Sequence, residues 1–284
     1  MDTHADTLFD TDVHVGSPAV RGGLTVFPVF TAHAVATRGY DTRTDALTVA
    51  ERAGSAVVEE LVVTNEGVRP VLVLEGELLE GGQQHRLAAR SALVAPDTSV
   101  VLPVRCVEQG RWSGGRAHVR AGRRAPVTVR AAQGQAEVWR RVERYGASAT
   151  GSLLETVGGR DAGAAALVAG LRPLPFQSGV LIGIGGQPLL LEVFDSPRTL
   201  ADVWDALLHA VALDAVTAPA IPTPGRRARR FTGHVGAVDT VRGIDDAGTH
   251  EQGESAHARV TTLRWRDRAV HTSALSVRHE LVTA

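Results

Sequence analysis

No lysine occurs in the 284 residues, so all 30 basic side chains are arginines. One interpretation of this bias is a GC-rich bacterial genome. The alternative, selection for bidentate recognition of phosphate by arginine, requires that the arginines cluster. Because 31 acidic residues bring the formal net charge to -1, the overall charge does not indicate binding to nucleic acid or to an anionic membrane.

Cysteine is also nearly absent: Cys106 is the only one, which excludes a disulfide within the chain. No apolar run reaches the roughly 18 residues of a membrane helix. The opening residues, MDTHADTLFDTDVHVG, are polar and lack the apolar core of a signal peptide. We therefore expect a cytoplasmic protein that does not contact a membrane.

The residues present are those of a globular protein, with 44% hydrophobic and 21% charged side chains. Residues 1–20 show no periodicity, and we expect them to form a flexible tail. Residues 21–284 are expected to form a single α+β domain with a mostly antiparallel β-sheet core and several flanking helices. Short connections outnumber helical crossovers, which argues against a doubly wound sheet.

β-branched and alternating segments predict strands at 24–30, 55–67, 87–94 and 99–107. Pro28 favours an edge or a bulge for the first of them. The turn signal Asn65-Glu66-Gly67 predicts that VRPVLVLEG forms a hairpin with the preceding strand.

Later in the chain, GVLIGIGGQPLLLEVF contains a glycine pair between two apolar runs. A dinucleotide-binding turn would require a helix after the glycines, so Gly185-Gly186 predicts a β-hairpin turn instead. ARVTTLRWRDRAVHTSALSV alternates in the same way and predicts a C-terminal hairpin that turns at 266–268.

Helices are predicted by caps and by apolar residues at helical spacing. Ser196 and Pro197 predict the start of a long helix, as N-cap and first-turn residue. Other helices are expected at 133–145, 152–158 and 161–172, and Thr44 and Gly54 suggest a short one between them. The arginine- and glycine-rich segment 116–130 indicates either a solvated loop or a loop that meets an anion. TAPAIPTPGRRARR, at about 217–230, indicates a Pro/Arg-rich linker.

Polar residues concentrate around the strands between 75 and 112, where unpaired buried charges would be costly. Glu75 and Glu77 share a face if their strand continues, and Glu108 could approach them from the next strand. Such carboxylates serve as general acid and base, or bind a divalent metal through oxygen. The alternative is a strand end that faces solvent. We predict these three glutamates as the catalytic residues.

The same stretch supplies candidate ligand-binding residues. Arg86 and Arg111 can pair with the carboxylates or clamp a phosphate, and the Gln84 amide suits a sugar hydroxyl. Gly81 permits a close backbone approach, and Trp112 could stack on a ring or pack in the core. Cys106 lies in an apolar run and is expected to be buried and structural.

Two runs, LEGELLEGGQQHR and VLPVRCVEQGRW, resemble the paired motifs of the ARG and rhodanese-phosphatase-superfamily-associated protein domain. His85 stands where that family usually has asparagine. FDSPRTLADVWDALLHAVALDA resembles the family's later helix, and the likeness spans roughly residues 24–215. The resemblance implies a setting near ADP-ribosylglycohydrolases, and hence a small-molecule or nucleotide ligand related to NAD or ADP-ribose.

Three hypotheses follow. The first is a hydrolase or transferase that acts on such a nucleotide through the central Glu/Gln/Arg site. The second is a non-catalytic ligand-binding domain with the same pocket. The third is a structural or oligomer-forming domain in which the polar residues form a fold-defining network.

Overall fold

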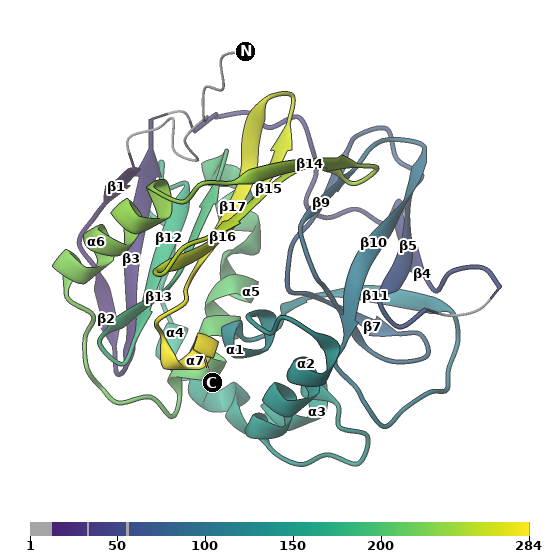
Figure 1. Ribbon diagram of the computed structural model, residues 1–284, viewed down its shortest axis with the longest axis horizontal. Helices are drawn as coiled ribbons and strands as arrows, with labels where there is room; N and C mark the ends of the chain where they lie inside the picture. Colours follow the sequence, from purple (N-terminus) through teal and green to yellow (C-terminus); the bar gives the residue numbers. More distant parts are fainter. Residues whose placement is uncertain (1–12, 33, 55–56, 284) are drawn as a thin grey trace.

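The computed structural model describes residues 13–32, 34–54 and 57–283. A large open sheet and a six-stranded closed barrel lie side by side, with short helices beneath the junction (Figure 1). Every strand pair in both is antiparallel. The predicted fold class, α+β with a mostly antiparallel core, is confirmed.

The open sheet has nine strands. In spatial order they are β1 (Val13–Val15), β3 (Leu24–Thr31), β12 (Gly179–Ile184), β13 (Gln187–Phe194), β17 (Arg268–Ser276), β16 (Ala258–Trp265), β15 (Gly248–Glu254) and β14 (Val241–Asp245), with β2 (Ala19–Arg21) also paired to β3.

The barrel closes in the order β10 (Thr98–Cys106), β5 (Glu60–Asn65), β4 (Leu47–Ala50), β11 (Ala117–Arg124), β7 (Glu77–Gly81) and β8 (Arg86–Ala88). A separate two-stranded sheet pairs β6 (Val71–Val73) with β9 (Ala92–Val94).

The helices of the described chain are α1 (Val127–Arg130), α2 (Gln135–Val142), α3 (Leu153–Thr156), α4 (Asp161–Val168), α5 (Pro197–Ala215), α6 (Gly225–Gly236) and α7 (Glu280–Thr283), with 3-10 turns at Glu143–Tyr145 and Val157–Arg160.

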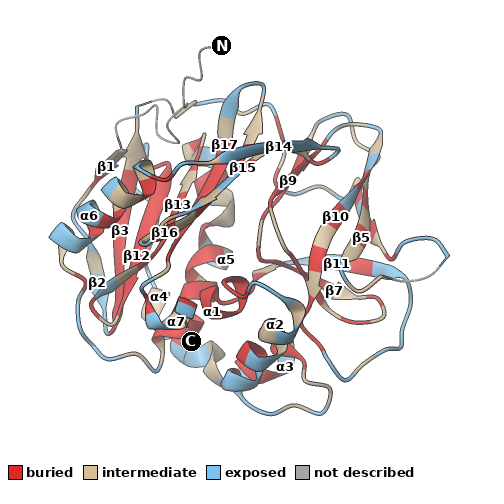
Figure 2. Cartoon of the chain, in the orientation of Figure 1, coloured by how far each residue is buried: buried red, intermediate tan, exposed pale blue. Residues whose placement is uncertain are grey.

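The open sheet is covered on both faces at β12, which explains the continuous apolar run of this strand. Val180 and Ile182 belong to the core that includes α5, whereas Leu181 belongs to the core that includes α6. Figure 2 shows β3 and β12 as buried along most of their length. Alternation in a strand thus directs apolar side chains to both covering helices.

Local signals position the hairpins and the long helix as predicted. Gly185 and Gly186 have φ of 57° and 84° at the β12–β13 turn, and Arg266 and Asp267 have φ of 50° and 61° at the β16–β17 turn. Two consecutive left-handed residues match the twist of a tight hairpin. The Ser196 hydroxyl accepts a hydrogen bond from the Arg198 N–H at the start of α5.

Two predictions in the N-terminal half are wrong. Residues 47–50 form β4, not a helix, because Leu47 and Val49 point into the barrel core while Thr48 is exposed. The strand after the turn at 65–67 does not pair with β5; β6 pairs with β9, and β5 lies between β4 and β10. Both differences follow from closure of the barrel, which buries Leu47 and Val49 and places β4 and β10, rather than β6, beside β5.

Three further boundaries differ from the prediction. The tail prediction for 1–12 lies outside the described residues, but Val13–Val15 already form β1. Pro28 does not lie on an edge strand; β3 has β12 on one side, and Gly16 opposes Pro28 on the other, between β1 and β2. The predicted strand at 87–94 is divided between β8 and β9.

The arginine-rich segments are also ordered. Residues 117–124 form β11 and 127–130 form α1, so the loop prediction for 116–130 is wrong. The predicted linker ends earlier than expected, because α6 begins at Gly225 and carries the arginines. Its Ala228 and Phe231 pack on the open sheet, which gives this polar helix a buried stripe.

Candidate functional site

The two motif runs meet at one end of the barrel, where they are hydrogen-bonded to each other. The Gln84 side-chain amide donates to the Glu108 carbonyl at 2.9 Å, and its oxygen accepts from Arg86 Nη1 at 3.1 Å. The His85 N–H donates to the Glu108 carboxylate at 3.0 Å. The motif therefore ties the β7–β8 loop to the segment after β10.

Glu108 is the centre of this network. Its carboxylate accepts hydrogen bonds from Arg111 Nε at 2.8 Å and from the Thr150 hydroxyl at 3.1 Å. Although burial opposes it, bonding to Arg111 and to the His85 N–H holds the pKa of Glu108 below its ordinary value. A carboxylate held in this way is a poor proton acceptor.

Arg86 is fully buried beside this network. Its Nη2 lies 3.7 Å from Glu51 Oε1, which also lies 3.2 Å from His118 Nε2. In the described part of the chain, Arg86 Nε and Nη2 and Glu51 Oε2 find no hydrogen-bond partner. Because buried polar atoms are normally satisfied, this is the least satisfied part of the barrel interior.

Two other predicted residues border the network. Gly81 has φ of 107°, and a side chain there would approach the Ala117 carbonyl to 2.9 Å, so its backbone approaches β11. Trp112 is 54% exposed, with the Arg86 guanidinium 6.0 Å from its ring, which excludes the core-packing alternative. Cys106 is buried as expected, and burial raises the pKa of its thiol.

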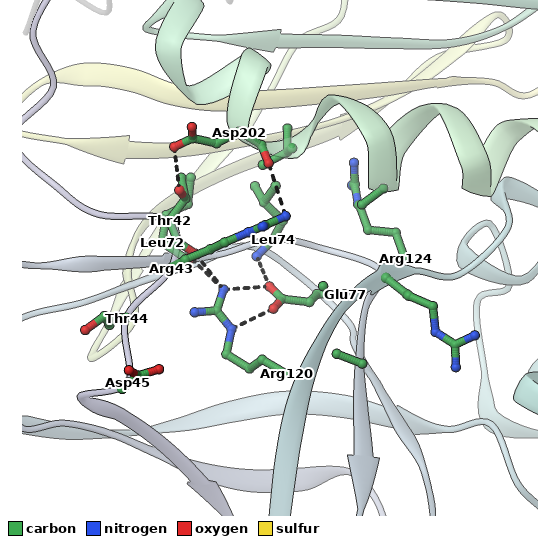
Figure 3. Close-up of a pocket in the computed structure, with 15 residues that line it drawn as sticks. Thr42, Arg43, Thr44, Asp45, Leu72, Leu74, Glu77, Arg120, Arg124 and Asp202 are labelled. Carbon is green, nitrogen blue, oxygen red and sulfur yellow. Dashed lines mark hydrogen bonds and ion pairs between the residues drawn. The ribbon is translucent and has the colours of Figure 1, made fainter. Parts of the chain in front are cut away.

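Glu77 lies elsewhere, in a pocket of about 320 Å³ between the barrel and α5 (Figure 3). Arg120, from β11, donates from Nε to Glu77 Oε1 at 2.6 Å and from Nη2 to Oε2 at 3.0 Å. Arg120 Nη2 also donates to the Thr42 and Leu72 carbonyls. This bidentate pair forms one wall of the pocket.

Arginines outnumber acidic residues in the lining of this pocket. Its charged residues are Arg43, Arg120, Arg123, Arg124, Asp45, Glu77 and Asp202. Asp202 is bonded by Arg38, which lies outside the pocket lining. Among the described residues, Arg43 forms no ion pair and donates only to the Asp202 carbonyl, at 3.4 Å, and Arg120 Nη1 makes no hydrogen bond. Both are therefore available as donors.

Glu75 occupies a third place, in a buried charge cluster between the barrel and the open sheet. Arg130 Nη2 lies 3.6 Å from Glu75 Oε1 and 2.8 Å from Glu192 Oε1. Arg124 bonds Glu192 at 2.7 Å and 3.0 Å. Burial would raise the pKa of Glu192, but Arg124 and Arg130 hold it well below its ordinary value.

The predicted convergence of Glu75, Glu77 and Glu108 does not occur. A turn at Glu75 and Gly76, where Gly76 has φ of 78°, precedes β7 and removes the shared strand face of Glu75 and Glu77. Each of the three glutamates pairs with a different arginine. The described residues contain no group of three His, Cys, Asp or Glu side chains that could hold a metal ion.

Sequence reasoning missed the partners that complete these sites. Glu192 had a readable signal, because a charge inside PLLLEVF must be compensated when the strand is buried. Glu51 and His118 had no such signal, because only barrel closure brings them to β7 and β8. Arg120 belongs to the arginine-rich segment 116–130, but its pairing with Glu77 also depends on barrel closure.

Within the described ranges, no helix has the length and apolar character needed to cross a membrane. No curated protein and no solved structure matches the chain. The motifs at the barrel end and the helix α5 both lie within residues 12–275, which match the family described as the ARG and Rhodanese-Phosphatase-superfamily-associated Protein domain. The chain belongs to this family.

Proposed function

We propose that the protein binds a small phosphorylated ligand, of the class of nucleotides related to NAD or ADP-ribose, in the pocket between the barrel and α5. The observation that carries this proposal is the pair of available donors, Arg43 and Arg120 Nη1, on the wall of a 320 Å³ pocket. Charge-assisted hydrogen bonds from arginine suit phosphate oxygens.

The pocket volume limits the ligand. Small-molecule sites span about 300–1,000 Å³, so this pocket is at the lower end. A sugar phosphate or a mononucleotide fits this size better than a whole dinucleotide. Leu72, Leu74 and Val203 supply apolar surface beside the arginines, as a base or a ribose requires.

A binding role is favoured over a mechanism in which Glu77 or Glu108 is the catalytic base. Glu77 is bonded by both oxygens to Arg120, and Glu108 accepts from three donors. Neither is free to abstract a proton. Glu77 therefore orients Arg120, and Gln84, Arg86, Glu108 and Arg111 stabilise the barrel end.

Isothermal titration calorimetry with AMP, ADP-ribose, NAD, ribose 5-phosphate and inorganic phosphate tests the proposal. Arg43→Gln removes an exposed cation with little effect on packing. We expect it to weaken binding of the best ligand by at least about 10-fold, because a hydrogen bond to a charged group contributes roughly 1.5–3 kcal/mol.

Arg226→Gln on α6 is the matched control, since Arg226 is exposed and does not line the pocket. It should leave the affinity unchanged. If no ligand of the panel binds the wild-type protein, or if Arg43→Gln binds as tightly as wild type, this pocket is not a phosphate site.

A further inference from the structure

A second pocket, of about 230 Å³, lies between the barrel and the far end of the open sheet. The loop residues Arg90 and Ser91 form its barrel side, and strands β14 to β17 form the other. The β14–β15 hairpin extends across this junction toward β9 (Figure 1). Neither the motif network nor the arginine pocket includes this site.

Ser91 and His271 form a close pair in the lining of this pocket. Ser91 Oγ lies 2.8 Å from His271 Nδ1, and it also accepts a hydrogen bond from the Glu75 N–H at 3.0 Å. Both side chains are nearly buried, yet both contribute to the pocket surface. The Glu75 N–H occupies one lone pair of Oγ and leaves its proton for another acceptor.

The surroundings determine which nitrogen of His271 carries the proton in the neutral ring. Nε2 lies 3.5 Å from Glu192 Oε2, and a carboxylate can only accept. Nε2 makes no hydrogen bond to a described residue, but the negative charge 3.5 Å away favours the tautomer with the hydrogen on Nε2, which leaves Nδ1 as the bare acceptor. Ser91 must then donate to Nδ1, which is the arrangement of an activated nucleophile and its base.

The ring of His271 is also fixed in orientation. It stacks on Phe194, with centroids 4.8 Å apart and an interplanar angle of 19°. Glu192 is itself held by Arg124 and Arg130. Glu192 cannot turn without breaking its ion pairs, and the buried Phe194 ring holds one face of the imidazole, so the Ser91–His271 geometry is preorganised.

We infer that Ser91 is a nucleophile and His271 its general base, and that the pair hydrolyses small carboxylic esters in this pocket. Oγ bonds to the ester carbonyl carbon while its proton moves to Nδ1. The bond from that carbon to the alkoxy oxygen breaks, and the alcohol leaves with this proton. Water, deprotonated by the same nitrogen, then releases the acid and restores Ser91.

Esters fit the site better than amides. Two arginines already compensate the charge of Glu192, the carboxylate that lies behind His271. An alkoxide leaves an acyl carbon more readily than an amine does, so ester hydrolysis demands less of this serine–histidine pair than amide hydrolysis. The 230 Å³ volume restricts the acyl group to a short one.

The test uses the whole folded chain with a fluorophosphonate and, separately, with 4-nitrophenyl acetate. Mass spectrometry of the digested protein should place the phosphonyl group on Ser91, and prior denaturation in urea should abolish this labelling. Ser91→Ala should lower the rate of ester hydrolysis by at least about 100-fold, and His271→Gln should slow the labelling of Ser91 to a similar degree.

Ser113→Ala is the matched control, because Ser113 is an exposed serine that does not line this pocket; it should behave as wild type. Circular dichroism establishes that each variant is folded. If His271→Gln does not fold, the labelling of the folded wild-type protein alone tests whether Ser91 is a nucleophile. Absence of phosphonyl on Ser91 in the folded wild type overturns the inference, as does hydrolysis that survives Ser91→Ala.

Discussion

Arg124 Nη1, on the barrel strand β11, donates to Glu192 Oε2, on the central sheet strand β13, at a distance of 2.7 Å. Both side chains are almost completely buried, and Figure 2 shows buried residues on both sides of this junction. The two sheet systems are therefore joined by a charge pair as well as by apolar packing. Glu192 has a second arginine partner, Arg130, so its charge is well compensated.

Glu192→Gln should strongly destabilise the protein, because buried Arg124 loses its carboxylate partner and buried Arg130 keeps only Glu75, at 3.6 Å. Breaking a buried ion pair from one side costs about 3–5 kcal/mol in the free energy of unfolding. Glu254→Gln is the control, since Glu254 pairs with Arg259 at the surface and its side chain is 50% exposed. It should cost less than about 1 kcal/mol. Urea denaturation measures both, and equal losses would contradict the buried role of Glu192.

The stability contributed by Glu108 should depend on pH in a defined direction. Its pKa in the folded state is lower than the 4.5 of the free side chain. Its contribution is therefore complete above the unfolded pKa and is lost as the pH falls through the folded pKa. From about pH 6 to pH 3, wild type should lose more unfolding free energy than Glu108→Gln.

Glu66→Gln, which changes an exposed glutamate, is the control for this comparison. Its pH dependence should follow that of wild type. If Glu108→Gln also follows wild type, then Glu108 is not held in its charged form by Arg111 and the His85 N–H.

Gly82→Ala should destabilise the barrel end. Gly82 has φ of 56°, and an added Cβ would lie 2.0 Å from His118 Nε2. His118 is buried between Glu51 and the Leu79 carbonyl and cannot easily move away. The left-handed backbone alone costs about 1–2 kcal/mol, so we expect a total loss of at least about 3 kcal/mol.

Gly115→Ala provides the comparison, because no described atom lies within 4 Å of a Cβ placed there. It should change the free energy of unfolding by no more than about 0.5 kcal/mol, as a typical surface substitution does, and its melting temperature should stay close to that of wild type. A Gly82→Ala protein as stable as Gly115→Ala would show that His118 is not packed as described.

Several elements were predictable because their signals are local. The Ser196 and Pro197 pair defines the start of α5, and the glycines at 185–186 define a hairpin, through hydrogen bonds and φ angles within a few residues. The family likewise follows from two contiguous runs. Glu108 and Arg111 also pair as expected, since three residues separate them.

Other elements depended on distant parts of the chain. Leu47 to Ala50 is a strand because the barrel supplies two neighbours, β5 and β11, and no short-range pattern encodes them. The arginines at 124 and 130 resembled those of a solvated loop, yet both are buried because Glu192 meets them from another sheet.

The sequence by itself determined the fold class, the β12–β13 and β16–β17 turns, the long helix and the family. Tertiary structure alone decided which charges meet: it separated Glu75, Glu77 and Glu108 and brought Ser91 to His271, 180 residues away. The physical reason is the separation along the chain over which each kind of interaction acts. Backbone preferences act between neighbours in the chain, whereas ion pairs and pockets depend on distances that only packing establishes.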